Sequence, residues 1–177
     1  MQVSRFLKML VVLSALMLLI PVTAAADPGD AKERPFKVEF SGPFEIEYPA
    51  GWCSPDTVGV TMTFTGGHGA HFGRLAGTAQ HCTNMATGEI TNGAGYFEAA
   101  NGDRLNATYD GWGSPTADPS VWDISAGHEY AGGTGRFANA DGHAVGATKA
   151  FFVGEDYGFV EGTLVGTLSY DASDRRN

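Results

Sequence analysis

Three histidines lie close together near the middle of the chain, where His68 and His71 are three residues apart and His81 follows ten residues later. Zinc prefers histidine nitrogens, and three such ligands with a bound water make an open catalytic site. However, the segment is rich in glycine and has no acidic residue between these histidines. We therefore interpret the three as solvent-exposed loop residues and predict no metal site. The pattern leaves open which way His128 and His143 face.

Four carboxylates come next as candidates for acid–base chemistry. Asp123 and Glu129 each adjoin an aromatic residue. Inside an apolar cavity the pKa of a carboxyl rises, which suits a general acid or base. Asp123 and Glu129 are therefore the candidate catalytic residues, provided that one of them faces a cavity. Glu45 and Glu47 alternate with apolar residues, which predicts a solvated strand face rather than a pair of glycosidase acids.

Aromatic side chains are numerous, and most of them are expected to pack in the core. Those that line a cavity would contact a ligand, and a tyrosine hydroxyl or a guanidinium would orient its polar group. The predicted ligand-binding residues are Tyr96, Tyr109, Trp122, Tyr130 and Arg136.

Cofactor motifs are missing from the sequence. The G-x-G pairs that begin at Gly93 and Gly133 lack the third glycine and the βαβ context of a dinucleotide site. Residues 66–69 are rich in glycine but lack the lysine of a phosphate-binding loop. We predict no cofactor.

The elements that must position these residues are strands. Apolar and polar residues alternate with a period of two in at least six segments, and no stretch has a sustained helical period. Asn-Gly and Asp-Gly pairs between the segments suit hairpin turns. About eight short antiparallel strands without covering helices predict an all-β fold, and glycines inside the strands favour a closed barrel over a sandwich.

Residues 93–102 and 133–142 share the pattern G-x-G-x-F-x-x-A-[N/D]-G. Repetition of this spacing predicts two copies of one local structure, a turn that leads into a strand. Phe97 and Phe137 are then expected to be paired structural plugs beneath equivalent turns.

The second copy, with the glycine before it, reads Gly-Gly-Thr-Gly-Arg-Phe-Ala-Asn-Ala-Asp-Gly over residues 132–142. It resembles the G-G-T-G-[K/R]-F-x-x-A-x-G signature of plant dirigent proteins and, more loosely, the allene oxide cyclase barrel superfamily. Residues 162–170 look like the last strand of the same barrel. The chain departs from the dirigent pattern at Ala138, where arginine is usual, and no motif places the cavity acids of the family.

The resemblance implies an eight-stranded antiparallel barrel with a central apolar cavity. Members of the family bind hydrophobic, oxidised or phenolic molecules and steer their cyclisation or coupling. Such barrels often form dimers or trimers, so a homo-oligomer is compatible with the resemblance.

The two ends of the chain differ in character from the barrel segment. Residues 1–26 have a basic start, an apolar stretch and a small-residue cleavage site, which predicts a secretory signal peptide. Residues 27–34 are expected to be a flexible lead-in, 35–170 the barrel domain and 171–177 a disordered tail. Loss of Arg5 and Lys8 with the signal peptide leaves nine basic against 20 acidic residues, a net charge of −11. This charge excludes nucleic acid as a partner, and no membrane contact is expected after cleavage.

Cys53 and Cys82 are the two cysteines of the chain. An even number of cysteines in an exported protein predicts one disulfide. The sequence as a whole predicts a secreted, extracellular or periplasmic barrel that binds a small apolar or aromatic molecule without catalysis. The alternatives are a cyclase-like or coupling enzyme that uses Asp123 or Glu129, and a structural module whose barrel is filled.

Overall fold

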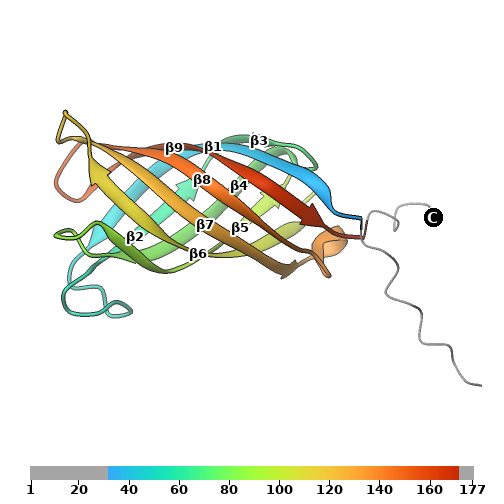
Figure 1. Ribbon diagram of the computed structural model, residues 1–177, viewed down its shortest axis with the longest axis horizontal. Coiled ribbons are helices and arrows are strands. Elements are labelled where there is room, and N and C mark those ends of the chain that lie inside the picture. The colour runs from blue at the N-terminus through green and yellow to red at the C-terminus, as the bar shows by residue number, and fades with distance from the viewer. Residues whose placement is uncertain (1–31, 172–177) are drawn as a thin grey trace, which may run out of the picture. The chain divides into compact units, whose positions relative to one another are not determined.

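The computed structural model describes residues 32–171, and its barrel is drawn in Figure 1. The predicted signal peptide, the first part of the lead-in at 27–31 and residues 172–177 of the tail lie outside the described residues. Across residues 32–171 there is no helical segment with the length and hydrophobicity of a transmembrane span.

The described chain is all-β apart from one short 3₁₀ helix, η1 (Gly135–Phe137). The strands are β1 (Arg34–Glu47), β2 (Val58–Phe64), β3 (Gly66–Gly69), β4 (Gly73–Thr83), β5 (Glu89–Ala99), β6 (Arg104–Pro115), β7 (Val121–Gly133), β8 (Asp141–Phe152) and β9 (Tyr157–Ser169). The alternation of buried and exposed residues in most of them matches the period of two in the sequence.

The strands close into an eight-stranded antiparallel barrel, in which β2 and β3 together count as one strand. β1 pairs with β9 from Arg34 opposite Leu168 to Glu45 opposite Tyr157, which joins the first and last strands. β2 and β3 are separated only by Thr65, and both pair with β1 and β4. Together they form one interrupted strand of the barrel. The prediction of a closed barrel is confirmed.

The interruption between β3 and β2 depends on a glycine in the neighbouring strand, β1. β1 pairs with β3 as far as Ser41 and with β2 from Phe44 onwards. Between these two positions, a Cβ atom at Gly42 would overlap the carbonyl oxygen of Thr63. The close backbone approach is therefore possible only because residue 42 has no side chain.

Side chains fill one half of the barrel completely. This plugged half is defined by Phe36, Phe72, Leu105, Tyr130 and Phe137, all buried. Phe72 stacks on Phe137 with ring centroids 4.9 Å apart, and Phe36 packs against Tyr130 at the same centroid distance. Figure 1 places η1 and the start of β1 at this end.

The two copies of the sequence repeat do not share one local structure, so that prediction is wrong. Residues 93–99 belong to β5, whereas residues 135–137 form η1. Gly135 has φ +56°, a left-handed conformation that turns the chain, and no positive φ occurs at Gly95. Phe97 and Phe137 are nevertheless both buried, at 4% and 0% exposure, and both rings contact Phe72.

The predicted disulfide is present. Cys53 and Cys82 are bonded with their Cα atoms 5.7 Å apart. The bond fastens the loop between β1 and β2 to the end of β4, at the barrel end opposite the plugged half. A disulfide of this kind is typical of proteins that fold in an oxidising compartment.

Candidate functional site

The half of the barrel opposite the plug contains an apolar cavity of about 80 Å³. We call this the hollow half. Four of its inward positions are alanines on four strands, and they leave space that larger side chains would fill. These residues are Ala79, Ala107, Ala126 and Ala150.

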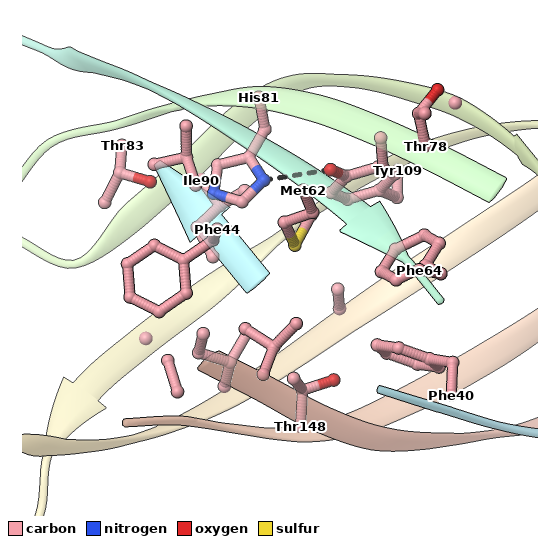
Figure 2. A pocket seen from close by; sticks show the side chains of 18 of the residues that line it. Phe40, Phe44, Met62, Phe64, Thr78, His81, Thr83, Ile90, Tyr109 and Thr148 are labelled. Atoms are coloured by element: carbon pink, nitrogen blue, oxygen red, sulfur yellow. Dashed lines mark hydrogen bonds between the residues drawn. The ribbon is translucent and has the colours of Figure 1, made fainter. Parts of the chain in front are cut away.

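Three phenylalanines form the floor of the cavity. The rings of Phe40 and Phe64 lie 4.9 Å apart, and Phe64 stacks on Phe97 at 5.5 Å. Phe97 in turn contacts Phe72 of the plug. In Figure 2, Phe40 and Phe64 lie at one side of the cavity, and Phe44 and Thr83 lie at the other. The floor therefore separates the cavity from the plugged half.

Large apolar side chains are exposed around the hollow end. They lie on its loops and on the adjoining strand ends, and we call them the apolar rim. The rim consists of Tyr48, Trp52, Met85, Trp112, Val153, Tyr157 and Phe159. Met85 also lines the cavity, so the rim is continuous with the interior. Met85 is the one rim residue that lines the cavity, whereas Trp112 and Phe159 have the outward parity of β6 and β9. An exposed apolar cluster of this kind is typical of an interaction surface.

One hydrogen-bonded pair of polar side chains faces this apolar interior. Nδ1 of His81 on β4 lies 2.9 Å from the hydroxyl of Tyr109 on β6, as the dashed line in Figure 2 shows. The same hydroxyl lies 3.2 Å from the carbonyl oxygen of Gln80. The pairing of β4 with β5 shifts register between Gln80 and Cys82, so this carbonyl sits at an irregularity of the sheet.

His128 on β7 continues this cluster. Its ring stacks on Tyr109 at a centroid distance of 4.9 Å, and the ring of Tyr130 follows at 6.5 Å. Nδ1 of His128 and the hydroxyl of Tyr130 are buried and find no hydrogen-bond partner within residues 32–171. Burial lowers the pKa of both His81 and His128 to about 4 and raises the pKa of both tyrosines. The cluster is therefore uncharged at neutral pH.

Three of the five predicted ligand-binding residues border the cavity. They are Tyr96, Tyr109 and Trp122. The ring of Tyr96 also packs against the guanidinium of Arg104, whose Cζ lies 4.4 Å from the ring centroid. The other two lie elsewhere. Tyr130 belongs to the plug, and Arg136 lies within η1, where its Nε is 3.7 Å from Asp103.

The two predicted catalytic acids lie on the outer surface. Asp123 is exposed and pairs with Lys149, and Glu129 is exposed on the same face of β7. The condition for their catalytic role, a side chain that faces the cavity, is not met. Among residues 32–171, no three His, Cys, Asp or Glu side chains come together as metal ligands.

The expectation that His81 is an exposed loop residue is wrong. His81 lies within β4 and is 6% exposed. The alternation Ala79, His81, Thr83 along β4 would have placed it inside. His128 has the same signal, because it shares the parity of Ile124 and Ala126. His68 is exposed on β3, and His71 lies in the turn after it.

Comparison of the chain with protein-family models, with curated proteins and with solved structures gives no match.

Proposed function

We propose that this protein is an exported barrel that binds a small apolar or aromatic molecule in its hollow half and releases it unchanged. The observation that carries the proposal is the apolar cavity, which reaches the apolar rim at Met85 and is bounded by the aromatic floor on the other side. Concave apolar sites with a few polar groups are the usual form of small-molecule sites.

The dimensions of the cavity limit the ligand. A dry protein cavity of about 150 Å³ can hold benzene, whereas this cavity measures about 80 Å³. The cavity is therefore smaller than a one-ring molecule needs, and we expect such a molecule to enter only with side chains at the walls moved apart. Met62 and Met85 line the cavity, and methionine adapts its shape more readily than branched or aromatic residues do.

The resemblance of residues 132–142 to dirigent proteins suggests a second function, the cyclisation or coupling of a hydrophobic substrate. These residues form the end of β7, η1 and the start of β8, at the plugged end of the barrel. Their position supports a role in folding rather than in chemistry. The outward direction of Asp123 and Glu129 also favours binding over this enzymatic alternative.

A matched pair of variants tests the proposal. Ala150→Leu adds volume inside the cavity, and Ala147→Leu adds the same volume on the exposed face of the same strand. With 4-fluorotoluene as the probe and ¹⁹F NMR as the readout, we expect binding to the wild type and to Ala147→Leu, and at least tenfold weaker binding to Ala150→Leu. Equal binding to both variants would place the probe outside the cavity and contradict the proposal.

The natural ligand can be sought in the protein from its own host. Native mass spectrometry of the exported chain, followed by denaturation, is expected to release an apolar compound at a fixed stoichiometry. A measured mass that corresponds to a chain starting at residue 27 would at the same time verify the predicted signal peptide. A chain that retains residues 1–26 would contradict this part of the proposal.

A further inference from the structure

The hydrogen bonds of Tyr109 determine which proton His81 carries. The Tyr109 hydroxyl is within hydrogen-bond distance of both Nδ1 of His81 and the carbonyl oxygen of Gln80. A phenol hydroxyl has one proton to donate, and a carbonyl oxygen can only accept. Both contacts are hydrogen bonds only when Tyr109 donates to Gln80 and the Nδ1–H of His81 donates to Tyr109.

This arrangement leaves the other ring nitrogen of His81 as an acceptor. A neutral imidazole has one N–H, so Nε2 carries a lone pair when Nδ1 holds the proton. Within residues 32–171, no hydrogen bond involves Nε2 of His81. Figure 2 shows this nitrogen on the side of the ring away from Tyr109, among side chains that line the cavity.

The other polar groups of the cavity do not offer the same recognition. The Tyr109 hydroxyl is engaged, and His128, whose ring also lines the cavity, has no hydrogen bond among residues 32–171 that would fix its tautomer. Thr78, Thr83 and Thr148 also line the cavity, but a hydroxyl both donates and accepts and so does not discriminate. Nε2 of His81 is therefore the group that can select for a hydrogen-bond donor.

We infer that the cavity selects a neutral, apolar molecule that carries a hydroxyl group, and that this hydroxyl donates its hydrogen bond to Nε2 of His81. The inference rests on the proposed function and adds the chemical class of the ligand. A ligand without a donor leaves the nitrogen unpaired in an apolar site, which is unfavourable. A carboxylate would bring negative charge against the lone pair. Tyr109 acts as a positioning residue because it holds the tautomer.

Two probes of nearly equal shape test this inference. 4-Fluorophenol has a hydroxyl where 4-fluorotoluene has a methyl group, and ¹⁹F NMR titration gives the dissociation constant of each. The measured quantity is the preference for the phenol, taken as the ratio of the two constants. We expect His81→Phe to lower this preference about tenfold, which is the factor for one hydrogen bond lost in an apolar site.

Control variants separate recognition from damage to the fold. His81→Gln keeps an amide oxygen near the position of Nε2 and is expected to retain most of the preference. His68→Phe changes an exposed histidine on β3, outside the cavity, and is expected to leave the preference unchanged. An equal preference in the wild type and in His81→Phe would overturn the inference while the proposed function stands. Failure of both probes to bind would overturn the proposed function and this inference with it.

The tautomer can be read directly in the wild-type protein, with no substitution. Long-range ¹H–¹⁵N NMR distinguishes a ring nitrogen with a lone pair from one with a bonded hydrogen. We expect Nε2 of His81 to be the lone-pair nitrogen, and Tyr109→Phe to give a mixture of both tautomers. A hydrogen on Nε2 in the wild type would overturn the inference.

Discussion

The plugged half and the hollow half of the barrel are built from the same strands and differ in the size of their inward side chains. β4 carries Leu75 towards the plugged end and Ala79 in the cavity wall, and β7 carries Tyr130 and Ala126 in the same way. The strand pairing continues through both halves without interruption between β8 and β9. The backbone thus forms one continuous barrel, and the size of the inward side chains decides which part of its interior is filled.

The surfaces of the two halves differ as well. Of the nine large apolar side chains that are exposed in the described part of the chain, seven belong to the rim of the hollow end. The other two, Val145 and Val165, face each other on the outer wall of β8 and β9. Among the described residues, the turns at the plugged end expose no large apolar side chain. The comparison indicates that one half is a packed core, and under the proposed function the other half is where a ligand would bind.

The largest effect on stability is expected from truncation in the plug. Phe137 is fully buried and stacks on Phe72, so Phe137→Ala should lower the free energy of unfolding by about 3–5 kcal/mol. Phe44→Ala, in the cavity wall, should cost less because the space that it opens joins an existing cavity. Urea denaturation of both variants provides the measurement, and a larger loss for Phe44→Ala would reverse our assignment of the two halves.

Removal of the disulfide should have the next largest effect. Cys53 and Cys82 are 29 residues apart in sequence, and a closed loop of this length stabilises by about 3–4 kcal/mol in the chain-entropy model. We expect the double variant Cys53→Ala/Cys82→Ala to lose this amount in urea denaturation. Hydrogen exchange should increase first around the loop between β1 and β2, and equal increases at the plugged end would argue against a local role.

Mild acid should destabilise the hollow half through its histidines. The folded-state pKa of His81 is lowered to about 4, below the ordinary value of 6.5. Between these two values the unfolded chain binds a proton that the folded chain does not, so stability falls as the pH decreases from about 6.5 to about 4. The loss from His81 amounts to about 3 kcal/mol, and His128 acts in the same direction.

Urea denaturation as a function of pH measures this effect. The titratable groups that face His81 are Tyr109 and, stacked beyond it, His128. His81→Phe should reduce the pH dependence in this range, and His68→Phe, on the outer surface, should not. An unchanged slope in His81→Phe would show that the ring is already protonated or hydrated in the folded state.

The smallest effect is expected from the exposed acids. Asp123→Asn and Glu129→Gln change side chains outside the barrel, so each variant should stay within about 0.5 kcal/mol of the wild type in stability. Binding of 4-fluorotoluene should also be unchanged. A loss of binding in either variant would show that the outer face of β7 contributes to the site.

The barrel was predictable from the sequence because its signal is local. Alternation in residues 36–40 and 58–64 reports the inward face directly, and the glycines inside the strands mark where a closed sheet bends. The disulfide was predictable from the number of cysteines and the expected compartment. These features depend on near neighbours in the chain or on composition.

The site was predicted less completely because it depends on which residues meet across the barrel. His81 and Tyr109 are 28 residues apart and come together only through the pairing of β4, β5 and β6. The sequence repeat also misled, since Leu105, three residues after the first copy, faces inward whereas Val145, three residues after the second copy, is exposed. Identical spacing does not fix the face of a strand when the preceding turn differs, because a shift of one residue reverses every side chain.

The aromatic floor closes the cavity on the side of the plugged half, so the barrel is not a channel. A molecule held above Phe40, Phe64 and Phe97 must leave by the opening through which it entered. Occupancy is therefore exclusive, since a second molecule cannot push the first one through. Under the proposed function, a ligand would enter and leave by one opening, at the barrel end where the disulfide at Cys53 holds a loop.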